Sequence, residues 1–97
     1  MRLIAETAIV RHNPRTEYRG LDEGGLLTQL DTGQRHGLNP VGALIWSLME
    51  GQAFAVLVAD VAAQLADPPP DLATDMEEFV EALRARHLVD VLDPEPS

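Results

Sequence analysis

The chain has 97 residues, of which 45% are apolar and only 4% are aromatic, and its formal net charge is −9. This length suits one domain around one largely aliphatic core, and the apolar fraction predicts that the chain folds. The absence of cysteine excludes disulfides, thiolate metal sites and thiol nucleophiles, while the acidic charge and the absence of lysine argue against a general nucleic-acid binder, because phosphate contacts need clustered basic side chains.

The ends of the chain carry no sign of targeting or of membrane insertion. No basic-then-apolar leader begins the sequence, and no apolar run approaches the ~20 residues that cross a bilayer. We therefore expect a cytoplasmic protein that contacts no membrane, with a single domain over residues 1–92. The proline-rich stretch over residues 93–97 is expected to be a flexible tail.

The first part of the sequence is predicted to form β-strands. Residues 7–11 have the composition of a strand, whereas residues 15–23 show no clear period and are expected to be irregular. Residues 24–30 alternate as a strand, and Asp31-Thr32-Gly33 is a turn that joins them to a returning strand over residues 34–38. In this last strand the alternation places Gln34, His36 and Leu38 on one face, and Arg35 and Gly37 on the other.

Three amphipathic helices are predicted after this strand. The first begins at Pro40 with Asn39 as its N-cap, and the second covers residues 54–65. The third follows Asp71, which is able to cap it, and residues 88–92 are then either a brief strand or a packed tail. The apolar stripe of the third helix consists of Leu72, Met76, Phe79, Val80, Leu83 and His87.

No cluster of reactive side chains indicates catalysis. The three histidines, His12, His36 and His87, fall in different predicted elements without metal-ligand spacing, and each is expected to be structural or solvated. Gly24-Gly25 is more simply a turn than a phosphate loop, and Glu77-Glu78 is expected on the solvated face of the third helix. We therefore expect no catalytic residue, no cofactor and no bound metal.

What remains is a binding module. A short antiparallel sheet followed by three helices offers one edge strand, residues 34–38, and one groove between that edge and a helix. The edge matters because its unpaired N–H and C=O groups can accept another chain as a further strand. With a net charge of −9, the partner is more plausibly neutral or basic than a polyanion.

Two stretches of the sequence carry a family resemblance. The more specific is TGQRHGLNPVGALIWSLMEG, with the run Gly-x-x-x-x-Leu-Asn-Pro-x-Gly-Ala over residues 33–43. The weaker is DMEEFVEALRARHLV, which begins at Asp75. Together they span about residues 24–92 and resemble the PqqD-like family of precursor-peptide recognition elements, most of all the small stand-alone members of lasso peptide biosynthesis.

The resemblance implies both a fold and a task. The fold is α+β and winged helix-turn-helix-like, with an N-terminal three-stranded antiparallel sheet packed against three helices. The task is to bind the leader segment of a ribosomally made, lasso-type precursor peptide as an extra strand, and to present it to a separate leader-cleaving protease and to the cyclase of the pathway. The peptide-binding residues that it implies are Gln34, Arg35, His36, Gly37, Leu38, Asp75, Met76, Phe79, Val80 and Leu83.

Within the third helix, we expect Phe79 and Leu83 to lean mainly into the core, and Met76 and Val80 to border the groove. The acids of this helix favour a leader with Lys or Arg near its docking end. The chain departs from the family's pattern at Arg35-His36, where members commonly carry Tyr or Trp, and the preferred leader side chains are expected to differ there.

Two other interpretations remain open at this point. A winged-helix DNA-binding or regulatory domain has the same helix count, although its recognition helix, residues 71–88, would open with four acids in eight residues. A subunit that stabilises a partner enzyme without touching a peptide is the second. A mobility-shift assay at low salt tests the first, and co-purification with an enzyme in the absence of any precursor tests the second.

Overall fold

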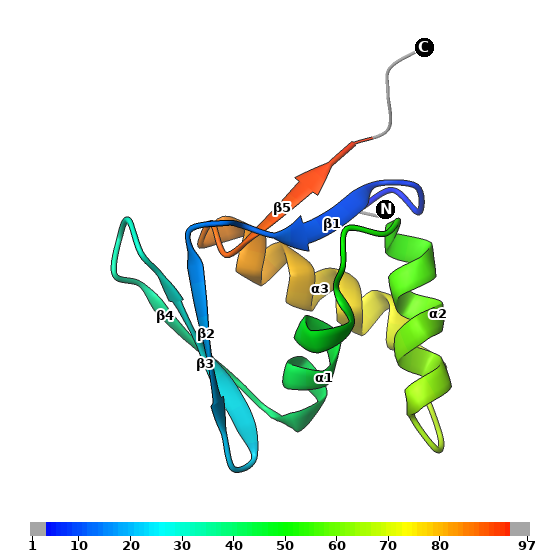
Figure 1. Cartoon of the computed structure of the whole chain (residues 1–97). Coiled ribbons are helices and arrows are strands. Elements are labelled where there is room, and N and C mark those ends of the chain that lie inside the picture. The colour runs from blue at the N-terminus through cyan, green and yellow to red at the C-terminus, as the bar shows by residue number, and fades with distance from the viewer. Residues whose placement is uncertain (1–3, 94–97) are drawn as a thin grey trace.

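The computed structural model describes residues 4–93, so the predicted tail over residues 93–97 lies outside the description except for Asp93. A three-stranded sheet stands beside the helices, and a two-stranded ribbon lies across one end of the molecule (Figure 1). The elements in chain order are β1 (Ile9–His12), β2 (Thr16–Leu21), β3 (Gly24–Gln29), β4 (Arg35–Leu38), α1 (Pro40–Leu48), α2 (Phe54–Gln64), α3 (Leu72–Ala85) and β5 (Val89–Leu92).

The three-stranded sheet is antiparallel with the order β2-β3-β4, and one of its members differs from the prediction. The strand predicted at residues 7–11 is present as β1, but β1 pairs with β5, from Ile9↔Leu92 to His12↔Val89. The third strand of the sheet is β2, inside the segment 15–23 for which the sequence predicts no regular structure. Because five of the six β2 residues are exposed, β2 needs no apolar alternation that a sequence could reveal.

The register of β3 and β4 defines the inner face of this sheet. Leu27 is fully buried and pairs with His36, so His36 turns toward the helices. Gln34 lies just before β4 rather than within it, although its carbonyl accepts a hydrogen bond from the Gln29 N–H at 2.8 Å. Burial confirms the predicted alternation for β4 itself, with His36 and Leu38 turned inward and Arg35 and Gly37 exposed, whereas Gln34, predicted on the inner face, is exposed.

Local chemistry determines where the helices begin. The Asn39 side chain accepts a hydrogen bond from the Gly42 N–H at 2.7 Å, which confirms the predicted N-cap of α1. Asp71 occupies the same position before α3, but its side chain makes no capping hydrogen bond, so the capping role predicted for it is wrong. The Leu72 N–H instead donates to the Pro69 carbonyl at 3.1 Å, which starts α3 from the proline-rich turn.

Replacing Asn39 with alanine is expected to lower the free energy of unfolding by about 1 kcal/mol, because the Gly42 N–H loses its acceptor. Chemical denaturation followed by circular dichroism measures the change. Asn39→Ser is the matched control, since a serine hydroxyl also caps helices. Equal losses in the two variants would contradict a capping role.

One aliphatic core joins both sheets to the helices. A ring stack adds to it on the β1 and β2 side: the His12 and Trp46 rings lie 3.6 Å apart, centroid to centroid, at an interplanar angle of 4°. Tyr18 follows at 6.4 Å from Trp46, and His12 Nε2 lies 2.8 Å from the Trp46 carbonyl oxygen. The stack fixes the sheet against α1. The largest fully buried side chains are Phe54, Ile4, Leu27, Leu57, Met76, Leu83, Leu88, Val10, Val61, Val80 and Val89.

Candidate functional site

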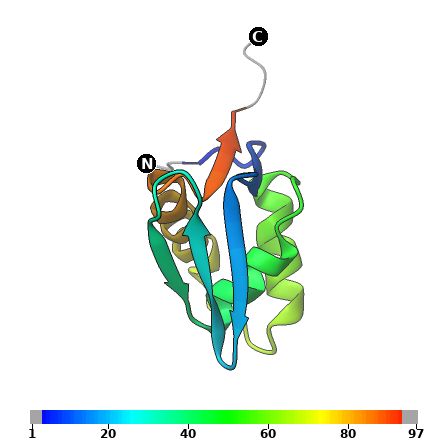
Figure 2. The same ribbon diagram turned by 60° about the vertical axis from the view of Figure 1, so that its left-hand side comes forward.

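β4 is an edge strand. It pairs with β3 on one side, and within residues 4–93 no strand pairs with its other side. Figure 2 shows β4 at the outer border of the sheet with α3 behind it, whereas α1 and α2 lie behind the opposite edge, β2. The outward N–H and C=O groups of β4 are therefore open to pairing with another chain.

α3 accompanies β4 from one end to the other. At the Leu38 end, a Cβ added to Gly42 would lie 3.1 Å from Phe79 Cε1 and 3.5 Å from Leu38 Cδ2. At the other end, Gln29 of β3 donates to the carbonyls of Gln34 and His87, each at 2.8 Å, which brings Arg86 beside the beginning of β4. We call the surface formed by β4 and by Asp75, Phe79, Ala82 and Arg86 the docking face.

The buried Gln29 side chain ties the sheet to the end of α3. Gln29 Nε2 donates to the His87 carbonyl at 2.8 Å, and Gln29 Oε1 accepts from the Asp31 N–H at 2.6 Å. His87 has a positive φ of 60°, the left-handed conformation that commonly follows a helix. Because both ends of this buried amide are bonded, the tie fixes the position of the hairpin relative to α3.

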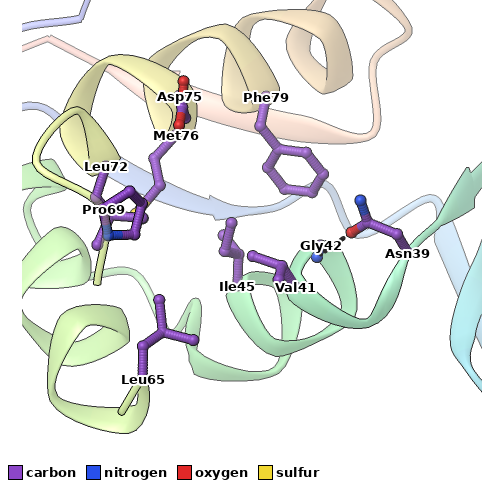
Figure 3. Close-up of a pocket in the computed structure, with 10 residues that line it drawn as sticks. All are labelled: Asn39, Val41, Gly42, Ile45, Leu65, Pro69, Leu72, Asp75, Met76 and Phe79. Carbon is purple, nitrogen blue, oxygen red and sulfur yellow. Dashed lines mark hydrogen bonds between the residues drawn. The ribbon is translucent and has the colours of Figure 1, made fainter. Parts of the chain in front are cut away.

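A cavity of about 340 Å³ opens beside the Leu38 end of β4. Phe79 points from α3 toward Gly42 and Val41 of α1, and Met76 extends beside Pro69 and Leu72 (Figure 3). Its volume lies within the range of about 300–1,000 Å³ typical of ligand pockets, and its lining is mostly apolar. The lining residues are Asn39, Val41, Gly42, Ile45, Leu65, Pro69, Leu72, Asp75, Met76 and Phe79.

The faces of α3 differ from the prediction at two neighbouring residues. Val80 is fully buried in the core, so the prediction that it borders the groove is wrong. Phe79 is only partly buried: it packs against the core and also lines the cavity, so its predicted core position holds only in part. Leu83 is fully buried as predicted, and Met76, although 1% exposed, contributes to the cavity wall. The core stripe is Leu72, Met76, Val80 and Leu83, and the stripe beside it is Asp75, Phe79, Ala82 and Arg86.

Part of the cavity wall comes from residues that the sequence did not indicate as site residues. The first turns of α1 contribute Val41, Gly42 and Ile45, and the turn between α2 and α3 contributes Leu65 and Pro69. The amphipathic pattern assigns the apolar residues among them to the core, and it does not distinguish residues of the cavity wall from residues at the centre of the core. One available signal is Gly42, since a buried glycine inside an apolar helix indicates close approach by another group, here the Phe79 ring.

The docking face holds one histidine with a perturbed charge. Burial, and after it the Arg86 guanidinium, hold the pKa of His36 below its ordinary value. The unfolded chain therefore protonates His36 at a higher pH than the folded protein does. The stability that this group contributes is present above about pH 6.5 and is lost as the pH falls.

Replacing His36 with glutamine is expected to remove that part of the pH dependence. Between about pH 7.5 and 5.5, the melting temperature of the wild type should fall more than that of the variant, because only the wild type must charge a half-buried imidazole beside Arg86. Taking the difference between the two proteins removes the pH dependence that comes from the carboxylates they share. Parallel curves of melting temperature against pH would show that protonation of His36 does not destabilise the folded protein.

Within residues 4–93, no three His, Asp or Glu side chains are grouped so that they could hold a metal ion. No helix of the described chain is long and apolar enough to span a membrane.

Residues 24–89 match the family model described as coenzyme PQQ synthesis protein D (PqqD). The structure of TbiB1 in complex with the TbiA(beta) leader peptide resembles this chain with a TM-score of 0.72 and 28% sequence identity, over 82% of this chain and 94% of that one. No curated protein matches. The similarity confirms the predicted α+β, winged-helix-like fold.

Proposed function

The chain belongs to the family of coenzyme PQQ synthesis protein D, and from this premise we propose that it is a non-catalytic protein that recognises the leader segment of a ribosomally synthesised, lasso-type precursor peptide. The observation that carries the proposal is its similarity, over 82% of the chain, to TbiB1, a protein solved with the TbiA(beta) leader peptide. The open edge of β4, flanked by α3 and next to an apolar cavity, supports the same task.

In this proposal the leader adds to residues 34–38 as a further strand. Ordering its backbone costs about 1–2 kcal/mol per residue, and each new hydrogen bond returns only about 0.5–1.5 kcal/mol. The cost of ordering the leader and the gain from its backbone hydrogen bonds therefore roughly cancel, and strand addition alone cannot discriminate between sequences. Affinity must come from side chains, and one bulky apolar leader residue that fills the cavity contributes about 1.5–3 kcal/mol.

The α3 residues implied by the resemblance divide into two groups. Asp75, Met76 and Phe79 line the cavity, and we propose that they contact the leader directly. Val80 and Leu83 are fully buried and support that wall from the core. The α3 acids favour a basic leader residue near the cavity end, because Asp75 stands there exposed.

The bound leader is then handed to other proteins. We propose that a separate leader-cleaving protease and the cyclase of the same pathway act on the precursor while this chain holds its leader in the cytoplasm. Nothing in the arrangement requires a cofactor on this chain. Co-precipitation of the protease and the cyclase, with and without the precursor, tests which of them the chain contacts.

The central test is binding of the leader of the precursor peptide encoded beside this gene. Fluorescence anisotropy with the labelled leader should give saturable binding at or below tens of micromolar, which corresponds to about −6 to −8 kcal/mol. A scrambled leader of the same composition is the control. Absence of binding at that concentration, or equal binding of the scrambled peptide, would remove the proposal.

A further inference from the structure

Three basic side chains gather at the end of the docking face opposite the cavity, in a chain whose net charge is −9. Arg35 and His36 lie on β4, and Arg86 directly follows α3. Gln29 of β3 donates to the carbonyls of Gln34 and His87, which brings the end of α3 beside the beginning of β4, and Arg86 lowers the pKa of His36 there. This local excess of positive charge is unusual in so acidic a protein.

The two arginines of this group have no carboxylate partner among residues 4–93. The ion pairs of the described chain engage Arg11 with Asp90, Arg15 with Asp31, and Arg84 with Glu81. Asp31, the acid on the same hairpin as Arg35, is thus held by Arg15 at 3.0 Å. Within the described residues, the Arg86 guanidinium donates only to the Ala82 carbonyl, at 3.3 Å, and Arg35 is exposed.

The positions of the three side chains suit recognition from both faces of an added strand. His36 turns inward, on the side of Arg86, and Arg35 turns to the outer face of the sheet. A strand that pairs with β4 directs successive side chains to alternate faces. A leader residue level with His36 therefore meets His36 and Arg86 when it points inward, and its neighbours meet Arg35.

We propose that His36 and Arg86 form an anion-binding subsite that captures an inward-pointing Asp or Glu side chain of the leader, while Arg35 favours an acid at the adjacent, outward-pointing position. The inference rests on the proposed function and adds to it a preference for an acidic leader residue. The anion-binding subsite and the cavity lie at opposite ends of the docking face, and both open to the inner side of β4. The acidic residue and the bulky apolar residue of the leader should therefore be about two or four positions apart.

Electrostatics gives a reason for this preference. In the free protein, the charge that acts on His36 is Arg86 at the end of α3, its partner on β3 is the apolar Leu27, and its neighbour Arg35 turns to the opposite face. A carboxylate placed beside His36 and Arg86 relieves the repulsion between the guanidinium and a protonated imidazole. The same carboxylate forms a charge-assisted hydrogen bond to Arg86, which otherwise lacks an acidic partner among residues 4–93.

The test uses random peptides displayed on phage, so that no leader sequence need be known. Panning on the wild-type chain should enrich peptides with Asp or Glu at one position and a bulky apolar residue about two or four positions away. Panning on the double variant Arg35→Gln/Arg86→Gln should retain the apolar residue and lose the acidic one. Arg84→Gln is the matched control, because Arg84 lies in the same helix turn but pairs with Glu81, and it should enrich the same peptides as the wild type.

An enriched peptide then allows a quantitative check. Changing its acid to the matching amide should weaken binding to the wild type by about five- to tenfold and leave binding to the double variant unchanged. Circular dichroism verifies that each variant is folded. Enriched peptides without an acidic preference, or a preference that survives in the double variant, overturn this inference and leave the proposed function standing. A failure to enrich any peptide, together with no binding of the leader, rejects the proposed function itself.

Discussion

Val80→Asp is expected to unfold the domain. Val80 is fully buried among the core side chains of α3, and an unpaired carboxylate there has no partner to compensate its loss of hydration. An uncompensated buried charge costs on the order of 3–5 kcal/mol, a large part of the about 5–15 kcal/mol that stabilises a typical domain. Far-UV circular dichroism and thermal melting measure the loss of structure.

Thr74→Asp is the matched control for this variant. Thr74 is exposed in the first turns of the same helix, where an acidic side chain interacts favourably with the helix dipole. This control should melt close to the wild type. A Val80→Asp protein that melts cooperatively near the wild-type temperature would place Val80 on the docking face after all.

Phe79→Ala is expected to leave the domain folded and to weaken leader binding by at least about tenfold, because the cavity loses the ring against which a bulky apolar leader side chain packs. Anisotropy titration with the labelled leader measures the dissociation constant, and a thermal melt measures the remaining stability. The partial exposure of Phe79 predicts a smaller stability loss than a buried phenylalanine would show.

Val56→Ala is the matched control for binding. Val56 is 49% exposed on α2 and does not line the cavity, so its truncation should change neither affinity nor fold. Unchanged affinity in Phe79→Ala would contradict the role of the cavity in leader recognition. Two consecutive residues of α3 thus have opposite expected consequences, one for stability and one for binding.

The helices could be predicted because capping residues mark where they begin and apolar spacing indicates which face is buried. Asn39-Pro40 begins α1 through a side-chain cap and a residue that suits the first helical position. The apolar spacing of α3 likewise predicts a helix, but the predicted stripe includes His87, which is exposed and lies beyond the end of α3 at Ala85. The rotation of α3 about its axis is less well determined, because Phe79 and Val80 are adjacent and both lie near the middle of a broad apolar stripe. Only packing against Gly42 and the core distinguishes them.

The sheet was harder to predict for a different reason. β2 exposes nearly all its side chains, so its strand conformation is set by backbone pairing with β3 and not by a buried face. The pairing of β1 with β5 joins residues at opposite ends of the chain, and no local pattern encodes such a contact. The cavity could not be predicted for the same reason, since its wall combines residues of α1, α3 and the turn that precedes α3.

The ring stack of His12 and Trp46 gives the protein an optical signal of its own. Trp46 is the single tryptophan of the chain, and it is 5% exposed with an imidazole parallel to it at 3.6 Å. Unfolding separates the two rings and transfers the indole to water, so its emission should shift to longer wavelength and change in intensity in one step. Equilibrium unfolding of each folded variant discussed above can therefore be followed without a label, from a side chain that belongs to the core and not to the docking face.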